Sequence, residues 1–288
     1  MVLLEKLSLF NMEHFRKLYN KNEDAYTCNK SFFEIYDEEH FLIKYLIRKQ
    51  IKLFKVNKEY IGYIWYEYPS QSGLSNIYAI YLKEEYMDMI NAKMLSFFKR
   101  TTFRYDMIAS SRNSNIMKKL NFNVNSKNIL MKIKTTNFSN VIKDRIKFRH
   151  FKEGQDEELR CEIQNSVFND KNRIPLTIED VRREEAEEYY INNFGVFIYN
   201  NQGQVVGYGQ VIYNKGLYTI VNLGILKEHR RHGYGEVLLR YLINICKQNS
   251  INNVYIRVDK DNLKAIALYT KVGFKEYQSF VSWYKYIN

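Results

Sequence analysis

A short turn with two glycines carries the residues of this chain that are best suited to hold a ligand. It reads Arg230-Arg-His-Gly-Tyr-Gly235, follows an apolar stretch and precedes a helical pattern. Glycines remove the Cβ atoms that would keep a ligand away from the backbone, and the exposed amides at a helix start favour an anion. The arginine and histidine side chains add donors beside those amides. The turn is therefore a candidate pyrophosphate site.

A later segment supplies a candidate acid. Residues 254–258 alternate as a strand does, and a helical pattern then begins near Asn262 and stops at Gly273. Asn262 and Tyr269 lie seven residues apart, so two helical turns bring them to one side. A tyrosine hydroxyl, with an ordinary pKa of about 10, is a reasonable acid for a departing thiolate. Tyr269 is the candidate catalytic residue, although packing is the competing interpretation in a chain with 25 tyrosines.

Two other phosphate-binding patterns do not fit the turn. A nucleotide-hydrolysing P-loop needs Lys followed by Ser or Thr after the last glycine, and Glu236 and Val237 stand there instead. The dinucleotide pattern G-x-G-x-x-G needs a third glycine at the position that Leu238 occupies. Neither ATP hydrolysis nor a Rossmann-type dinucleotide site is therefore indicated.

The helix after the turn is predicted to give it a packed support. Five apolar residues recur at the i, i+1, i+4, i+7, i+8 spacing of one buried stripe, namely Leu238, Leu239, Leu242, Ile245 and Cys246. The turn is therefore expected to begin a helix that is anchored in the core.

The combined pattern resembles the GNAT family of N-acetyltransferases. The family's strand, loop and later helix correspond here to Leu223-Gly-Ile225, to Arg230–Gly235, and to the stretch from Asn262 through Ala265 and Tyr269 to Gly273-Phe274. The match spans most of residues 205 to 275. One departure is Arg231, where glycine is common in the family. Because the ligand is contacted by backbone there, the substitution should be tolerated.

The resemblance implies that the C-terminal half binds acetyl-coenzyme A without a metal. It places the amides of residues 231–236 on the pyrophosphate, residues 223–225 along the pantetheine arm, and Tyr269 beside the sulfur. The implied cofactor contacts are Leu223, Gly224, Ile225, Arg230, Arg231, His232, Gly233, Tyr234, Gly235, Glu236, Asn262 and Ala265.

The general base is left open by the sequence. Residues 216–223 contain no carboxylate, and Glu228, which follows that strand, is expected to face solvent. A water relayed by backbone carbonyls or by Asn222 is the alternative.

An acidic segment precedes the central strands. Thr177 and Asp180 approximate a capping box, so residues 177–190 are predicted to contain a helix. Its carboxylates could hold a cationic amine, or they could form a solvent-facing surface.

An internal repeat divides the chain. A shift of 144 residues sets Leu82-Lys-Glu84 onto Leu226-Lys-Glu228. It also sets Met94, Leu95, Phe97 and Phe98 onto Leu238, Leu239, Tyr241 and Leu242, an apolar pattern that selection for packing explains. At a shift of 152, residues 115–122 echo residues 267–274, with Met117 in the place of Tyr269. The N-terminal copy has Tyr86–Asn91 where the glycine turn should be, and the acidic Asp88 there would repel a pyrophosphate. We expect that copy to bind no cofactor and to act as a scaffold or as a wall of the acceptor site.

Composition agrees with a cytoplasmic enzyme. The 288 residues would make about two domains. No run approaches the roughly 18 apolar residues of a membrane span, and the N-terminus lacks the layout of a signal peptide. Cys28, Cys161 and Cys246 are scattered and odd in number, which favours a reducing compartment and forms no metal-ligand cluster.

The chain is basic, with a formal net charge of +12. Residues 1–140 carry 22 Lys and Arg against 14 Asp and Glu, and residues 141–288 carry 22 against 18. The lysines are dispersed rather than clustered, so nucleic acid is not the expected partner.

We therefore expect an α/β chain of two tandem GNAT-like domains, 1–138 and 142–288, each a mixed, mostly antiparallel central sheet flanked by helices. The second is expected to move an acetyl group to a primary amine by direct transfer in a ternary complex, because no cysteine is placed near the cofactor loop. The alternative is a non-catalytic acyl-CoA-binding regulatory module. The sequence names neither the amine, whether antibiotic, polyamine, amino acid or protein terminus, nor the oligomeric state.

Overall fold

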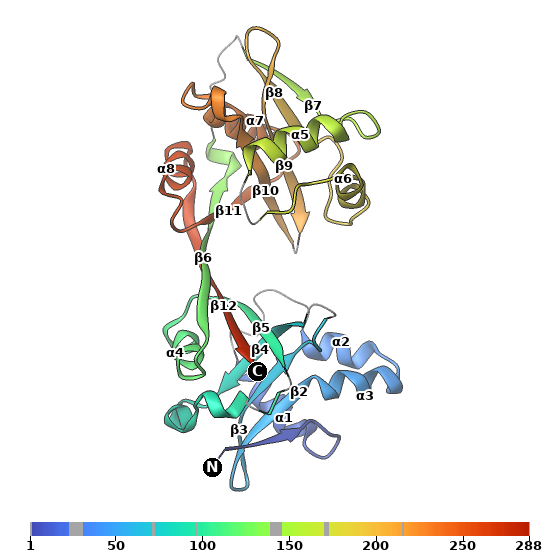
Figure 1. Cartoon of the computed structure of the whole chain (residues 1–288), viewed down its shortest axis with the longest axis vertical. Coiled ribbons are helices and arrows are strands. Elements are labelled where there is room, and N and C mark those ends of the chain that lie inside the picture. Colours follow the sequence, from blue (N-terminus) through green and yellow to red (C-terminus); the bar gives the residue numbers. More distant parts are fainter. Residues whose placement is uncertain are drawn as a thin grey trace. The chain divides into compact units, whose positions relative to one another are not determined.

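The chain folds into two compact units (Figure 1). The computed structural model describes residues 2–22, 31–70, 73–95, 97–98, 100–138, 146–169, 173–214 and 216–287, and Cys28 lies outside these ranges. Unit 1 contains Met1–Asn128 and Gln278–Asn288, and unit 2 contains Ile129–Tyr277.

The units do not follow the predicted division at residues 138 and 142. Strand β6 (Asn123–Lys134) hydrogen-bonds to β11 (Asn253–Asp259), so its second half belongs to unit 2. Residues 280–287 of strand β12 (Lys275–Ile287) pair with β5 (Thr101–Ile108), so the end of the chain belongs to unit 1. Each unit thus takes one strand from the other half of the sequence, which a pattern read along a continuous chain does not reveal.

Unit 2 is a mixed sheet with helices on both faces. Its strand order is β6-β11-β10-β9-β8-β7, where the pairs from β7 to β10 are antiparallel and β10 with β11 is parallel. The strands are β7 (Lys147–His150), β8 (Gly195–Tyr199), β9 (Val205–Asn214) and β10 (Leu217–Ile225), and the helices are α5 (Glu157–Val167), α6 (Ile178–Glu185), α7 (Tyr234–Gln248) and α8 (Leu263–Val272).

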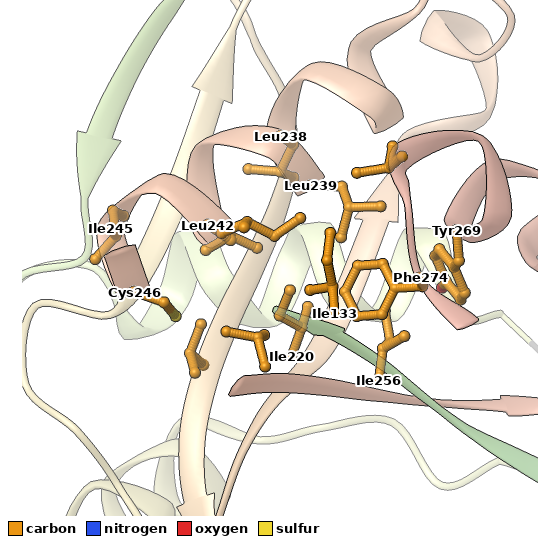
Figure 2. Close-up of a cluster of buried hydrophobic side chains, with 14 of the residues drawn as sticks. Ile133, Ile220, Leu238, Leu239, Leu242, Ile245, Cys246, Ile256, Tyr269 and Phe274 are labelled. Atoms are coloured by element: carbon orange, nitrogen blue, oxygen red, sulfur yellow. The ribbon is translucent and has the colours of Figure 1, made fainter. Parts of the chain in front are cut away.

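Helices α5 and α7 lie on opposite faces of this sheet. A Cβ added to Gly209 in β9 would meet Leu242 of α7, whereas one added to Gly224 in β10 would meet Val167 of α5. The predicted stripe of α7 is confirmed, because all five of its residues are at most 6% exposed and join one hydrophobic cluster with Ile220, Ile256 and Phe274 (Figure 2). The α7 helix is therefore anchored in the core along its length.

Unit 1 has the same strand arrangement. Its sheet runs β1-β2-β3-β4-β5-β12, with antiparallel pairs from β1 to β4 and a parallel pair of β4 with β5. The further elements are β1 (Val2–Lys6), α1 (Met12–Asn20), α2 (Phe32–Glu38), α3 (Phe41–Lys49), β2 (Ile51–Val56), β3 (Glu59–Tyr66), β4 (Leu74–Leu82), the 3-10 helices η2 (Glu84–Met89) and η3 (Ala92–Leu95), and α4 (Ser111–Lys119).

The parallel strand pairs show the internal repeat directly. In unit 1, residues 74–76 pair with residues 102–104, and in unit 2 residues 218–220 pair with residues 254–256. The two pairs are related by the shifts of 144 and 152 residues that the sequence repeat indicates. Both halves therefore build the same pair of parallel strands at the centre of their sheets.

The repeat is lost where the phosphate turn should be. Residues 84–95 of unit 1 form two short 3-10 helices at the place where unit 2 has the turn and the start of α7. Asp88 pairs with Lys119, which lowers the pKa of Asp88, and Met117 is fully buried. Phe97, which the repeat aligns with Tyr241, is 68% exposed, so the expectation that it is kept for packing is wrong. The helix η3 ends at Leu95, and among the described residues no α-helix contains Phe97.

Candidate functional site

A cleft of about 680 Å³ opens in unit 2 at the carboxyl ends of β10 and β11. Strands β10 and β11 pair in parallel at residues 218–220 and 254–256. The cleft begins where this pairing ends, and residues 220–225 of β10 and 256–259 of β11 line it. A register shift between Val221 and Gly224 sets two residues of β10 opposite one residue of β9, and Asn222 there has a left-handed φ of 55°. The bulge leaves an extra residue of β10 out of the ladder beside the cleft.

The residues predicted from the sequence lie around this one cleft, with one exception. The lining includes Leu223, Gly224, Ile225, Arg230, Arg231, Gly233, Tyr234, Gly235, Glu236, Asn262, Ala265 and Tyr269, whereas His232 does not line it. The His232 ring contacts the carbonyl of His229, with Nδ1 at 3.3 Å from that oxygen. Whether the lining residues bind acetyl-CoA stays a prediction.

Sequence reasoning missed the wall that α5 supplies. Val167 and Phe168, at the carboxyl end of α5, line the cleft opposite β10. Gly224 allows this approach, because a Cβ there would lie 2.1 Å from Val167 Cγ1. The two segments are almost 60 residues apart in the sequence, and no local pattern joins them.

The turn before α7 has the left-handed geometry that glycine accepts most easily. Gly233 is the N-cap of α7 with a φ of 86°, and Arg231 has a φ of 69°. A non-glycine residue in this region costs about 1–2 kcal/mol, so the family's usual glycine has a backbone reason at position 231. The chain nevertheless accommodates an arginine there.

Gly235 differs from Gly233 because neither the backbone conformation nor the packing at position 235 requires a glycine. Its φ is not positive, and an added Cβ would make ordinary contacts, at 3.7 Å, with Ile225 and Leu268. Gly235 lines the cleft in the first turn of α7, where unpaired amides point outward. The missing side chain therefore leaves room for a ligand rather than for a neighbouring element.

Arg230 and Asn262 have structural contacts that the sequence did not predict. Arg230 Nε donates to the carbonyl of Ile225 at 2.8 Å, and its Nη2 donates to that of Val167 at 3.3 Å, so this side chain joins the turn to both walls of the cleft. Asn262 is the N-cap of α8 and accepts a hydrogen bond from the Ala265 amide. The predicted start of this helix at Asn262 and its end at Gly273 are confirmed.

Glu236 is the acidic residue of the first turn of α7. It accepts hydrogen bonds from Lys271 Nζ at 2.6 Å and from Arg240 Nε at 3.1 Å. The pKa of Glu236 is lowered, mainly by the hydrogen bond from Lys271 and further by the one from Arg240. Two cations thus offset its charge beside the candidate anion site. The other charged lining residues, Arg230, Arg231, Arg257 and Lys264 against Asp259, leave the cleft positive.

Tyr269 reaches the cleft from the buried side of α8. It is 8% exposed, packs near Phe274, and has no recorded hydrogen bond from its hydroxyl to another described residue (Figure 2). Burial raises the pKa of Tyr269 to about 12, so the hydroxyl keeps its proton at neutral pH. A neutral hydroxyl that faces a cleft can donate to a charge that develops there.

The candidate bases fall in different places. Glu228 is exposed and does not line the cleft, as expected, whereas Asn222 lines it at the bulge. The predicted capping box of Thr177 and Asp180 is confirmed at the start of α6. In that acidic segment, Glu184 pairs with the fully buried Arg160 and accepts a 2.7 Å hydrogen bond from Gln210.

Two further findings concern other kinds of site. Across the described ranges, no group of three or more His, Cys, Asp or Glu residues could hold a metal ion. No helix in the same part of the chain has the length and apolar character to cross a membrane.

A family model and several curated relatives each match part of the chain. Residues 161–274 match the model of the acetyltransferase (GNAT) family. A mycothiol acetyltransferase of Amycolatopsis mediterranei is 26% identical over 153 residues, which are 50% of this chain and 50% of that protein. N-alpha-acetyltransferase 50 of Danio rerio is 39% identical over 74 residues, which are 25% of this chain and 44% of that protein. The matches thus span about half the length of these relatives.

Solved structures share the fold along the whole chain. A GCN5-related N-acetyltransferase from Sphaerobacter thermophilus has a TM-score of 0.67 at 16% identity, covering 100% of this chain and 96% of that one. A tandem GNAT protein from the clavulanic acid biosynthesis pathway has a TM-score of 0.57 at 9% identity, covering 99% and 98%. Residues 161–274 therefore match the acetyltransferase (GNAT) family, and the whole chain has the fold of these two solved structures.

Proposed function

We propose that unit 2 transfers the acetyl group of acetyl-CoA to a primary amine. The observation that carries the proposal is the cleft between β10 and β11, which ends at the positively charged start of helix α7. Gly235 lies at that helix start, and the fold itself does not require a glycine there. A pyrophosphate fits the amides of residues 231–236. An extended arm fits the edge of β10 that faces β11, since the pairing of these two strands covers residues 218–220 of β10 and not residues 223–225. Tyr269 lines the same cleft.

The residues of the cleft have separate tasks in this reaction. The amine nitrogen attacks the thioester carbonyl carbon, and the carbon–sulfur bond breaks. Tyr269 donates its hydroxyl proton to the departing sulfur, and the attacking nitrogen loses a proton to a water held near Asn222. Backbone amides at the bulge are placed to polarise the carbonyl oxygen.

Direct transfer is favoured over a cysteine intermediate. Burial raises the pKa of Cys246 to about 12 and also raises that of Cys161, so both thiols stay protonated at neutral pH. Neither cysteine lines the cleft. A thiolate is the nucleophilic form, so neither residue is suited to carry the acetyl group.

The acceptor is proposed to be a small molecule or a peptide amine. This proposal is supported by the names of two relatives, a mycothiol acetyltransferase and an N-alpha-acetyltransferase. An acyl-CoA-binding regulatory module remains the second candidate function, because the two carboxylates that line the cleft already have partners: Glu236 accepts from Lys271 and Arg240, and Asp259 accepts from the Asp261 amide.

The test measures thiol release from acetyl-CoA against a panel of amines and peptides. Tyr269→Phe should lower kcat by about 10²-fold with little change in acetyl-CoA affinity, since the hydroxyl acts only on the departing sulfur. Tyr255→Phe is the matched control, because Tyr255 is 7% exposed in the same unit and does not line the cleft. Tight binding of acetyl-CoA with no turnover on any amine would support the regulatory module instead.

A further inference from the structure

Unit 2 has a second cleft, of about 670 Å³, which shares no lining residue with the first. We call it the basic cleft and define it by Lys132, Lys134, Arg240, Lys275, Glu276 and Tyr277. These residues come from the end of β6, the middle of α7 and the start of β12. Its volume lies within the usual range for small-molecule sites.

The charge in the basic cleft is strongly positive. Lys132 and Lys134 are two residues apart on β6, so they project from the same side of the strand. No ion pair is recorded for Lys132, Lys134 or Lys275 within the described ranges. Arg240 is paired with Glu236, so three lysines remain, and against them stand Glu276 and the carboxyl end of α8, which adds about half a negative charge. An anion would relieve the remaining repulsion.

One aromatic ring, that of Tyr277, lines the basic cleft, and the ring of Tyr255 packs against it. Lys132 Nζ lies 5.2 Å from the ring centroid of Tyr277 and 5.5 Å from that of Tyr255. The Tyr255 and Tyr277 rings meet at 5.5 Å in an edge-to-face arrangement. Tyr277 is 55% exposed and can stack on a planar group. A ligand with both phosphate and a flat ring, such as a nucleotide, fits these two features.

One side chain connects the two clefts. Arg240 lines the basic cleft, and its Nε hydrogen-bonds to Glu236, which lines the first cleft beside the candidate phosphate turn. Arg240 and Lys271 together neutralise the Glu236 carboxylate. An anion that draws Arg240 toward the basic cleft would leave the charge of Glu236 less neutralised, and that charge repels a pyrophosphate.

We propose that the basic cleft binds a nucleotide phosphate and that its occupancy weakens acetyl-CoA binding through the Arg240–Glu236 contact. The binding half of this proposal is independent of the proposed function, whereas the coupling half rests on it. Coupling is reciprocal, so acetyl-CoA would weaken the nucleotide by the same factor.

The binding half is tested by calorimetry with ATP as the probe. The full chain carries Gly235→Glu, which blocks the first cleft, so binding there cannot be mistaken for the second site. We expect this variant to bind one ATP per chain, and we expect the further pair Lys134→Glu with Lys275→Glu to abolish that binding. The control pair Lys147→Glu with Lys152→Glu changes two exposed lysines elsewhere in the unit and should leave ATP binding intact. Pyrophosphate should bind more weakly than ATP, and Tyr277→Ala should remove that difference. Absence of ATP binding, or binding that survives the first pair, overturns the proposal.

The coupling half is tested in the chain with an intact first cleft. Saturating ATP should raise the Kd for acetyl-CoA by about fivefold or more. The increase should vanish in Lys134→Glu with Lys275→Glu, whereas direct competition in the first cleft would persist there. An unchanged Kd would overturn the coupling. Failure of the unmodified chain to bind acetyl-CoA would instead refute the proposed function, and the ATP titration would still stand by itself.

Discussion

Replacing Gly235 by alanine should separate ligand binding from folding. The added Cβ meets Ile225 and Leu268 at ordinary distances and needs no left-handed backbone, so the fold accepts it. Alanine is about 0.5–1 kcal/mol better than glycine inside a helix, and an end position gives less, so Gly235→Ala should be neutral or slightly stabilising. The same methyl group lies in the cleft where a pyrophosphate must approach the backbone. Losing one charge-assisted hydrogen bond costs about 1.5–3 kcal/mol, or roughly 10- to 100-fold in Kd.

Thermal unfolding and calorimetry with coenzyme A measure the two effects on one protein sample. Gly233→Ala is the informative companion, because that position has nothing within 4 Å but a φ of 86°. Its alanine should cost about 1–2 kcal/mol of backbone strain and lower both stability and affinity. If Gly235→Ala left the affinity unchanged, the first turn of α7 would not be in contact with the phosphate. If it lowered the unfolding temperature by several degrees, the glycine would be structural.

Three further predictions follow from the same site. Gly224→Ala should destabilise the chain by about 1–3 kcal/mol in chemical denaturation, because its Cβ collides with Val167 Cγ1, and Val167→Ala should recover part of that loss; additive effects would refute the contact. Arg231→Gly should raise the unfolding temperature slightly, since it removes left-handed strain of about 1–2 kcal/mol at some cost in chain entropy, and a marked fall would contradict this. Because burial raises the pKa of Tyr269 to about 12, the contribution of its neutral hydroxyl to stability is complete below pH 10 and is lost as the pH rises from about 10 toward 12. Loss of the Tyr269 proton should therefore not lower turnover below about pH 10, whereas a fall in turnover near pH 9 that Tyr269→Phe abolishes would contradict the raised pKa.

Local features of unit 2 could be predicted from the sequence because they depend on neighbouring residues. The α7 stripe, the start of α8 near Asn262, its stop at Gly273 and the capping box of α6 all follow from periodicity or from side chains that satisfy nearby amides. The predicted site residues other than His232 line one cleft for the same reason, since the turn and the helix start are continuous in sequence.

Features that depend on distant segments could not be predicted. The wall formed by Val167 and the hydrogen bonds of Arg230 to two carbonyls need the packed fold. The end of β6 pairs with β11 and the end of β12 pairs with β5, and no pattern within either strand shows which distant strand will be its partner. Phe97 has an apolar side chain at the expected spacing, but its segment forms no α-helix among the described residues, so spacing alone was misleading there.

The most direct test of the central claim is the stoichiometry of acetyl-CoA binding to the full chain, measured by calorimetry. One competent cleft, in unit 2, predicts one acetyl-CoA per chain and loss of that binding in Gly235→Glu, whose side chain fills the cleft with negative charge. Asp88→Ala, in the corresponding segment of unit 1, should leave the titration unchanged. A stoichiometry near two, or binding that persists in Gly235→Glu, would contradict the account.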